Sequence, residues 1–146
     1  MANIVFNIAK GRLAYYASLP NANDALIAVP IEATGIESDA ALIDYTNLST
    51  LLAGPSNEQT TMGRKVLAGV TVTVDNVNDW VDISATNPVW TAASGNPIAA
   101  LIICYDPDTT TGTDADLVPL SKHDFAVTPN GGDITGTITT SFARAQ

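Results

Sequence analysis

The chain has 146 residues, of which 46% are hydrophobic and 14% are charged, and six basic against fifteen acidic side chains give a formal net charge of -9. This length is typical of one domain, and so apolar a composition argues against intrinsic disorder. Proteins bind nucleic-acid phosphates and anionic membranes through Lys and Arg. The acidic balance therefore argues against both kinds of partner, and no basic residue stands between Lys65 and Lys122.

Targeting signals and cysteine usage indicate where the chain folds. The N-terminal sequence lacks the basic and apolar regions of a secretory signal, and no apolar run reaches the length of a membrane span. Cys104 is the only cysteine, so an intramolecular disulfide is excluded. It stands in an apolar run, where a thiol behaves as a small buried hydrophobe. We therefore expect synthesis and folding in a reducing cytoplasm.

Residues 6–16 fit two local structures. Apolar side chains recur there at helical spacing, but Gly11 interrupts them and costs about 1 kcal/mol relative to Ala in a helix. An extended arm would instead place Leu13, Tyr15 and Ala17 on one face. The sequence leaves both alternatives open.

Two near-continuous apolar runs predict strands. Residues 25–31 (ALIAVPI) form the first, and Pro30 within it indicates a sheet edge or a bulge. Residues 98–105 form the second, which is apolar on both faces. A strand of that kind is expected in the centre of a sheet or sandwich.

One short helix is predicted at residues 48–52, where leucines form an apolar stripe. Thr46 or Asn47 can cap its N-terminus, and Gly54-Pro55 ends it. Residues 56–63 then form a polar loop. From residue 66 onward the apolar period changes from that of a helix to that of a strand.

Residues 70–74 alternate Val with Thr, the sequence DNVND turns the chain, and residues 80–84 return as the second strand of a hairpin. If Val81 and Ile83 face the core, Trp80 lies on the opposite face. An outward Trp is a candidate partner contact, and plain cross-strand packing is the alternative.

The remainder of the chain predicts further short strands, with a turn at residues 129–132 before the last of them. These strands are expected at residues 89–92, 117–120, 125–128 and 134–140. Short strands, frequent turns and one small helix together predict a mainly β fold, a single-domain β-sandwich or β-barrel. The domain spans residues 1–146, with residues 1–16 as a candidate docking arm.

The sequence offers little for catalysis. His123 is the only histidine and hence the only candidate base of a Ser or Cys triad. On a strand, the adjacent Asp124 would point to the opposite face, and no G-x-S-x-G motif accompanies it. One His and one Cys fall short of a structural zinc site. We therefore expect a loop or strand-end histidine that makes one hydrogen bond, and neither enzymatic activity nor a cofactor.

Residues 106–116 contain the densest group of candidate cation ligands. Carboxylates and hydroxyls are the ligands that Ca²⁺ prefers, but Thr110 occupies the third acidic position of an EF-hand loop and no Glu closes it. The favoured alternative is an acidic surface loop turned by Asp and Gly, and no metal. The carboxylates in question belong to Asp106, Asp108, Asp114 and Asp116.

Three stretches resemble a family of small virion proteins of tailed bacteriophages, described as head decoration or minor structural proteins. These stretches are FNIAKGRLAYYASLPNANDALIAVPIEATG, VTVTVDNVNDWVDISATNPVWTA and CYDPDTTTGTDADLVPLSKHDFAVTPNGGDIT. The resemblance runs from about Phe6 to the C-terminus. It implies no enzyme activity and no cofactor, assigns no residue a role, and leaves the capsid surface, the head–tail region and the tail tip open.

Together with the composition, the resemblance leads us to expect a non-enzymatic capsid decoration protein that is made in the bacterial host cytoplasm, binds the outer surface of the assembled shell and stabilises it. Its expected partners are the major capsid protein and copies of itself, with a trimer among the options. The alternative is a recognition module of the tail or capsid exterior that binds host cell-surface glycan. Aromatic residues with Lys or Arg are typical of interface hot spots. The expected partner-binding residues are Phe6, Lys10, Arg12, Tyr15, Tyr16 and Trp80.

Overall fold

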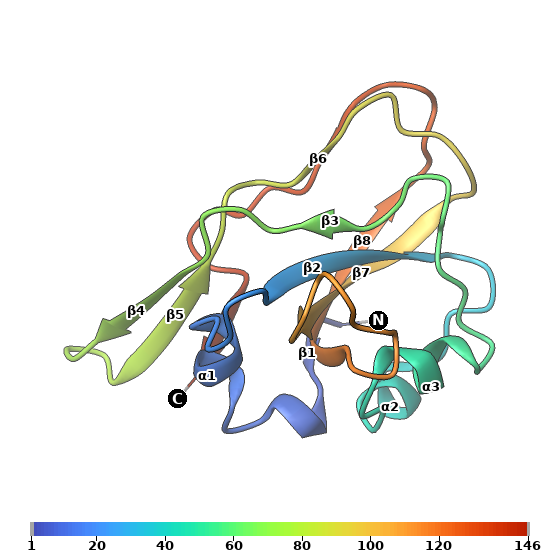
Figure 1. Ribbon diagram of the computed structural model, residues 1–146. Helices are drawn as coiled ribbons and strands as arrows, with labels where there is room; N and C mark the ends of the chain where they lie inside the picture. Colours follow the sequence, from blue (N-terminus) through green and yellow to red (C-terminus); the bar gives the residue numbers. More distant parts are fainter. Residues whose placement is uncertain (1, 146) are drawn as a thin grey trace.

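The computed structural model describes residues 2–145, and the chain is mainly β (Figure 1). Its strands are β1 (Ile4–Val5), β2 (Ala25–Glu32), β3 (Lys65–Val66), β4 (Thr71–Asp75), β5 (Trp80–Ser84), β6 (Val89–Trp90), β7 (Ile98–Asp106), β8 (Val118–Val127), β9 (Ile134–Thr135) and β10 (Ala143–Ala145). Its helices are the 3₁₀ helix η1 (Asn7–Ala9) and the α-helices α1 (Leu13–Ala17), α2 (Asp39–Leu42) and α3 (Leu48–Leu52).

The strands form three antiparallel sheets, which is consistent with the predicted β-sandwich-like single domain. The largest sheet has five strands in the order β1-β8-β7-β2-β3. The second has three strands in the order β10-β5-β4, and β6 pairs with β9 in the third. Among the described residues, no helix has the length and hydrophobicity needed to cross a bilayer.

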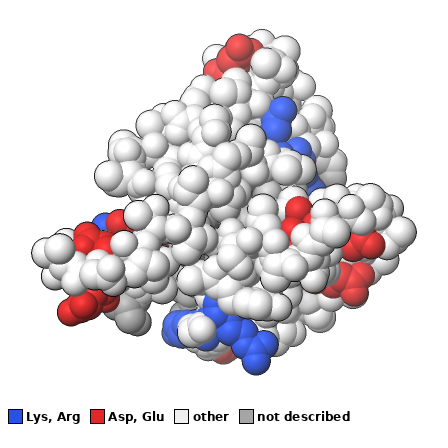
Figure 2. Space-filling view, turned by 60° about the vertical axis from the view of Figure 1, so that its left-hand side comes forward, with Lys and Arg blue, Asp and Glu red and all other residues white. Residues whose placement is uncertain are grey.

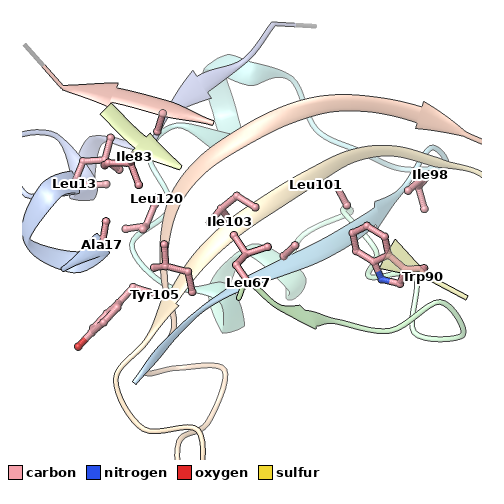
Figure 3. Close-up of a cluster of buried hydrophobic side chains, with 14 of the residues drawn as sticks. Leu13, Ala17, Leu67, Ile83, Trp90, Ile98, Leu101, Ile103, Tyr105 and Leu120 are labelled. Atoms are coloured by element: carbon pink, nitrogen blue, oxygen red, sulfur yellow. The ribbon is translucent and has the colours of Figure 1, made fainter. Parts of the chain in front are cut away.

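The five-stranded sheet is buried on both faces. Alternate residues of β2 and β7 point to opposite faces, so each face receives its own apolar set. One face packs against α1, the small sheets and the segment after β3 (Figure 3). The other packs against α2, α3 and Phe6. This double burial confirms that the apolar run at residues 98–105 forms a central strand.

Local features of β2 and α3 also follow from their sequences. The carbonyl of Pro30 accepts from the N–H of Gln59 at 2.9 Å. The Pro30 nitrogen therefore faces that segment and not β7, so no donor of the β2–β7 ladder is lost. A register shift at Ile31/Glu32 adds the expected bulge. The predicted cap of α3 is confirmed, because the Asn47 side chain accepts from the N–H of Thr50 at 2.8 Å.

The N-terminal segment combines parts of both predicted alternatives. Residues 7–9 and 13–17 are helical, and between them Gly11 adopts a φ of 77°, which a glycine tolerates without strain. The break at Gly11 lets Leu13 and Ala17 enter the main core. Residues 4–5 pair with β8, so the described part of the segment is packed against the body of the domain.

Three strand predictions near the C-terminus differ from the structure. The strands expected at residues 117–120 and 125–128 form a single strand, β8. The polar residues between them stay in the strand because the buried side chain of Lys122 has ion-pair partners in Asp39 and Asp124. The segment at residues 134–140 contributes only β9, which pairs with β6 and not with the preceding strand.

Lys122 of β8 and Asp39 of α2 form the centre of a polar network that also includes the N-terminal segment. The side chain of Lys122 has no exposed surface, and its Nζ lies 2.7 Å from Asp39 Oδ1 and 2.7 Å from Asp124 Oδ1. Asp39 also accepts from the backbone N–H of Ala2 at 2.6 Å. The hydrogen bond from Lys122, followed by that from Ala2, lowers the pKa of the Asp39 carboxyl.

Replacing both carboxylates, by Asp39→Asn with Asp124→Asn, should lower the free energy of unfolding by about 3 kcal/mol or more, because it leaves a buried cation without a counter-charge. Lys122→Met should cost less, since the side chains of Asp39 and Asp124 are 26% and 40% exposed and can be rehydrated. Urea titration of the variants measures both changes. A larger loss in Lys122→Met than in the double variant would contradict this account.

Candidate partner-binding surface

A hollow of about 630 Å³ opens between the N-terminal segment and the β4–β5 hairpin. Lys10, Leu13 and Ala14 contribute to one wall, and the hairpin contributes Val81 and Trp80 to the other. The hairpin packs against α1 through Ile83 near its base, whereas its far end projects from the body of the domain (Figure 1). The hollow thus brings together Lys10 and Trp80, two of the predicted partner-binding residues.

Trp80 lies on the predicted face of the hairpin. Asp82 and Arg144 share this face, and Ile83 on the opposite face is fully buried. The Arg144 guanidinium lies 3.7 Å from the centroid of the Trp80 ring, a cation–π contact. Arg144 Nε also donates to Asp82 Oδ1 at 2.8 Å, which lowers the pKa of Asp82. The indole Nε1 of Trp80 is shielded from solvent and has no hydrogen-bond partner.

Lys10 lines the wall opposite the hairpin, whereas Arg12 is not part of the lining, and the hairpin wall also carries the acids Asp75 and Asp79. Lys10 and Arg12 are exposed, and neither forms an ion pair with a described residue. Lys10 Nζ donates to Asn7 Oδ1 at 2.8 Å. Tyr15, in the helix α1 that follows Arg12, is 59% exposed, and its ring contacts that of Tyr16 edge-on. Tyr16 in turn packs against the ring of Tyr105, so it serves the core more than the surface.

A broad uncharged face lies on the side of the hairpin. Figure 2 turns that side forward and shows few charged side chains in the middle of the face, with Lys, Arg, Asp and Glu gathered toward its rim. Depletion of charge at the centre with polar groups at the rim is the usual anatomy of a protein–protein interface. The exposed valines of the hairpin, Val74 at 61% and Val77 at 89%, add apolar area.

The prediction that Phe6 contacts a partner is wrong. The side chain of Phe6 has no exposed surface and lies in the second core cluster with Leu42 and Leu48. Its backbone N–H donates to the carbonyl of Leu120 at 3.0 Å, which holds the residue beneath the sheet. Sequence analysis did not identify Arg144 as a residue of this surface, although its guanidinium contacts Trp80 and Asp82. The short strand ARA carries no pattern that predicts its pairing with β5.

His123 makes one side-chain hydrogen bond, as expected, between its Nε2 and Ser121 Oγ at 2.9 Å. The expectation of a loop or strand-end position is wrong, because His123 lies in the middle of β8. Asp124 lies on the other face of β8 with Lys122, so it does not orient the imidazole. Ser121 is only 2% exposed, which denies a substrate carbonyl access to its hydroxyl. Burial, and secondarily the charge of Lys122, lowers the pKa of His123 below its ordinary value.

The carboxylates of the loop at residues 106–116 are already engaged within the chain. Asp108 accepts from Thr110, whose hydrogen bonds lower the pKa of Asp108 to about 2. Asp116 accepts from the N–H of Thr113 at 2.9 Å, and Asp114 pairs with a guanidinium. Within residues 2–145, no three or more His, Cys, Asp or Glu side chains are grouped to hold a metal ion.

The loop at residues 106–116 is anchored through Arg64. Arg64 Nη1 lies 2.6 Å from Asp114 Oδ1, and Nη2 lies 2.6 Å from Glu58 Oε2. This arrangement makes the loop part of the scaffold. No residue of the loop lines the hollow beside Trp80, so the structure does not bring the aromatic ring and the acidic loop together as one glycan site.

Comparison with known proteins adds no relative. The sequence matches no protein-family model. No curated protein and no solved structure matches the chain at a significant level. The functional interpretation therefore depends on the geometry of this chain and on the sequence resemblance given above.

Acidification from pH 7.5 to 5.5 should lower the free energy of unfolding through His123. Its pKa in the folded state lies below the unfolded value of about 6.5, so the unfolded chain binds more protons and stability is lost as pH falls through this range. His123→Gln should flatten this part of the profile, measured by urea titration at each pH. An unchanged pH dependence in the variant would refute the assignment.

Arg64→Ala should lower the free energy of unfolding by about 2 kcal/mol, because it leaves two partly buried carboxylates unpaired. Calorimetry of the variant and the unmodified chain measures this loss.

Millimolar Ca²⁺ should leave the Tm of the unmodified chain unchanged to within about 1 °C, since a ligand that binds only the folded state would raise it. Calorimetry with and without Ca²⁺ measures the Tm. A clear rise in Tm with Ca²⁺ would show that the loop binds the cation.

Proposed function

We propose that this chain is a non-enzymatic structural protein of a bacteriophage virion, a head decoration protein that binds the outer surface of the assembled shell and stabilises it. Its partners are the major capsid protein and copies of itself. The sequence resemblance supports the virion assignment. The features that best support binding are the hollow between the N-terminal segment and the hairpin, where Lys10 faces Asp75, Asp79 and Trp80, and the uncharged face on the side of the hairpin.

The composition of this surface suits attachment to a repeated lattice. A chain of net charge -9 is repelled by other acidic surfaces, so contact requires local neutrality or local positive charge. The uncharged face supplies neutrality, and the unpaired cations Lys10 and Arg12 supply the positive charge next to the exposed ring of Tyr15. Burial of Tyr15 and of the hollow against a shell protein would add apolar area.

Binding to the assembled lattice alone is what stabilises a shell. A ligand that binds one state and not another shifts the equilibrium toward the state it binds. A decoration protein of this kind needs no catalytic pocket, only a rigid body and a contact surface. The five-stranded sheet, which is buried on both faces, makes the domain rigid, and the surface beside the hairpin supplies the contact.

The charge reversal Lys10→Glu should weaken binding to purified shells of the encoding phage roughly tenfold, or ~1.4 kcal/mol. The measurement is cosedimentation of the chain with shells assembled from the major capsid protein. Lys65→Glu is the matched control, because Lys65 on β3 also lacks an ion-pair partner among the described residues and lies outside the hollow.

The control should bind within about twofold of the unmodified chain, since both variants change the net charge equally. Equal losses in the two variants would mean that overall charge governs attachment and would contradict the assignment of the surface. If the unmodified chain fails to bind shells but binds host cell-surface glycan, the decoration proposal is wrong and the recognition alternative replaces it.

A further inference from the structure

Strand β4 is an open sheet edge. It forms the outer strand of the three-stranded sheet and pairs only with β5. With five residues it is longer than the other edge strands described, β1, β3, β6, β9 and β10, which have two or three residues each. The edge lies on the projecting hairpin (Figure 1).

The register of the hairpin identifies which peptide groups are free. The carbonyl of Ile83 accepts from the N–H of Phe142 at 2.9 Å, so the backbone groups of Ile83 face away from β4. Val72 lies directly opposite Ile83. In an antiparallel ladder the two residues of such a pair both turn their N–H and C=O groups outward. The groups of Val72, and two residues later those of Val74, therefore point to the open edge.

Nothing in the sequence of β4 protects this edge. Natural proteins block open edges with Lys, Pro, bulges or very short strands. The strand Thr71–Asp75 contains no Lys or Pro, and its pairing with β5 runs without a register shift. Four of its five residues are β-branched, which favours strand pairing. Val74 is 61% exposed on the same strand.

We infer that β4 is a self-association edge that pairs, antiparallel and about a two-fold axis, with β4 of a second copy of this chain. The axis passes beside Thr73. Val72 then lies opposite Val74 of the second copy, and the outward N–H and C=O groups of these two residues exchange hydrogen bonds on both sides of the axis.

Charge complementarity favours a second copy as the occupant. Two chains of net charge -9 can approach only through uncharged surface, and residues 70–74 carry no charge. The one acid of the strand, Asp75, falls opposite Thr71 of the second copy, whose hydroxyl can donate to the carboxylate. No acid faces another acid in this register, and like charges directly opposite would be destabilising.

The paired area sets the strength of the contact. Two five-residue strands bury less than the roughly 800 Å² per partner of a stable complex. The pairing is therefore weak in dilute solution and is favoured where copies are concentrated, as on a surface that binds many of them. The inference depends on the geometry of β4 alone, and not on the proposed function.

Cysteine cross-linking tests the register directly. Thr73 faces its own symmetry mate as a non-hydrogen-bonded pair with a Cα–Cα distance of about 4.5 Å, which a disulfide can bridge. The variant Thr73→Cys should give disulfide-linked dimers under mild oxidation. Native Cys104 is fully buried and does not contribute.

Thr71→Cys is the matched control. Thr71 is exposed like Thr73 and lies on the same face of the strand, but in the inferred register it is offset from its symmetry mate by four residues, roughly 14 Å. Thr73→Cys should therefore cross-link about tenfold more than Thr71→Cys at equal concentration. Equal yields would overturn the inference, because random collision would link both sites alike.

A second variant blocks the edge without touching the hairpin. In the Thr73→Cys background, Val74→Pro removes an N–H that points away from β5, a position where strands tolerate Pro, and should abolish the cross-link. Val74→Thr keeps the N–H and should preserve it. Circular dichroism checks folding, and the comparison of Thr73→Cys with Thr71→Cys decides the matter if the proline variant does not fold.

The cross-linking experiment tests the self-association edge independently of the proposed function. Cross-linking at position 73 uses the purified chain without shells, whereas the decoration proposal is tested by cosedimentation with shells. Failure of either experiment leaves the other standing.

Discussion

The burial of the central strand β7 on both faces is the constraint on which the rest of the structure depends. Its neighbours β8 and β2 are hydrogen-bonded to it along most of their lengths, so the apolar side chains of all three point alternately to two faces. A sheet of this kind must be covered twice. Helices α2 and α3 cover one face, and α1 with the two smaller sheets covers the other.

The way the second face is covered creates the surface that we propose for binding. The three-stranded sheet reaches the core through Ile83 near the base of its hairpin and through Ala143 of β10, while Val74 and Val77 nearer the tip remain exposed. The open edge of β4 lies on this projecting part, and the hollow opens between it and the N-terminal segment. A rigid, doubly covered body thus carries one protruding element, and we propose that binding uses that element and the hollow beside it.

The parts of the fold that the sequence predicts are those with a strong local signal. The run at residues 98–105, the cap at Asn47 and the alternation in residues 70–74 each have one dominant physical cause, and each is observed. Strands of two or three residues, such as β1 and β10, have no periodicity to detect. The continuity of β8 escaped prediction because it depends on Lys122 meeting Asp39, a pairing between distant segments.

In the candidate surface, too, some features follow from local sequence and others depend on contacts between distant segments. The face of the hairpin on which Trp80 lies follows from strand alternation, but its position across the hollow from Lys10 depends on tertiary packing, and the burial of Phe6 depends on α2 and α3 packing over it.

Quantifying this chain relative to the major shell protein in purified particles tests the central claim most directly. Lattice decoration predicts hundreds of copies per particle, in fixed ratio to the shell protein; a handful of copies, confined to a vertex or the tail, would contradict it.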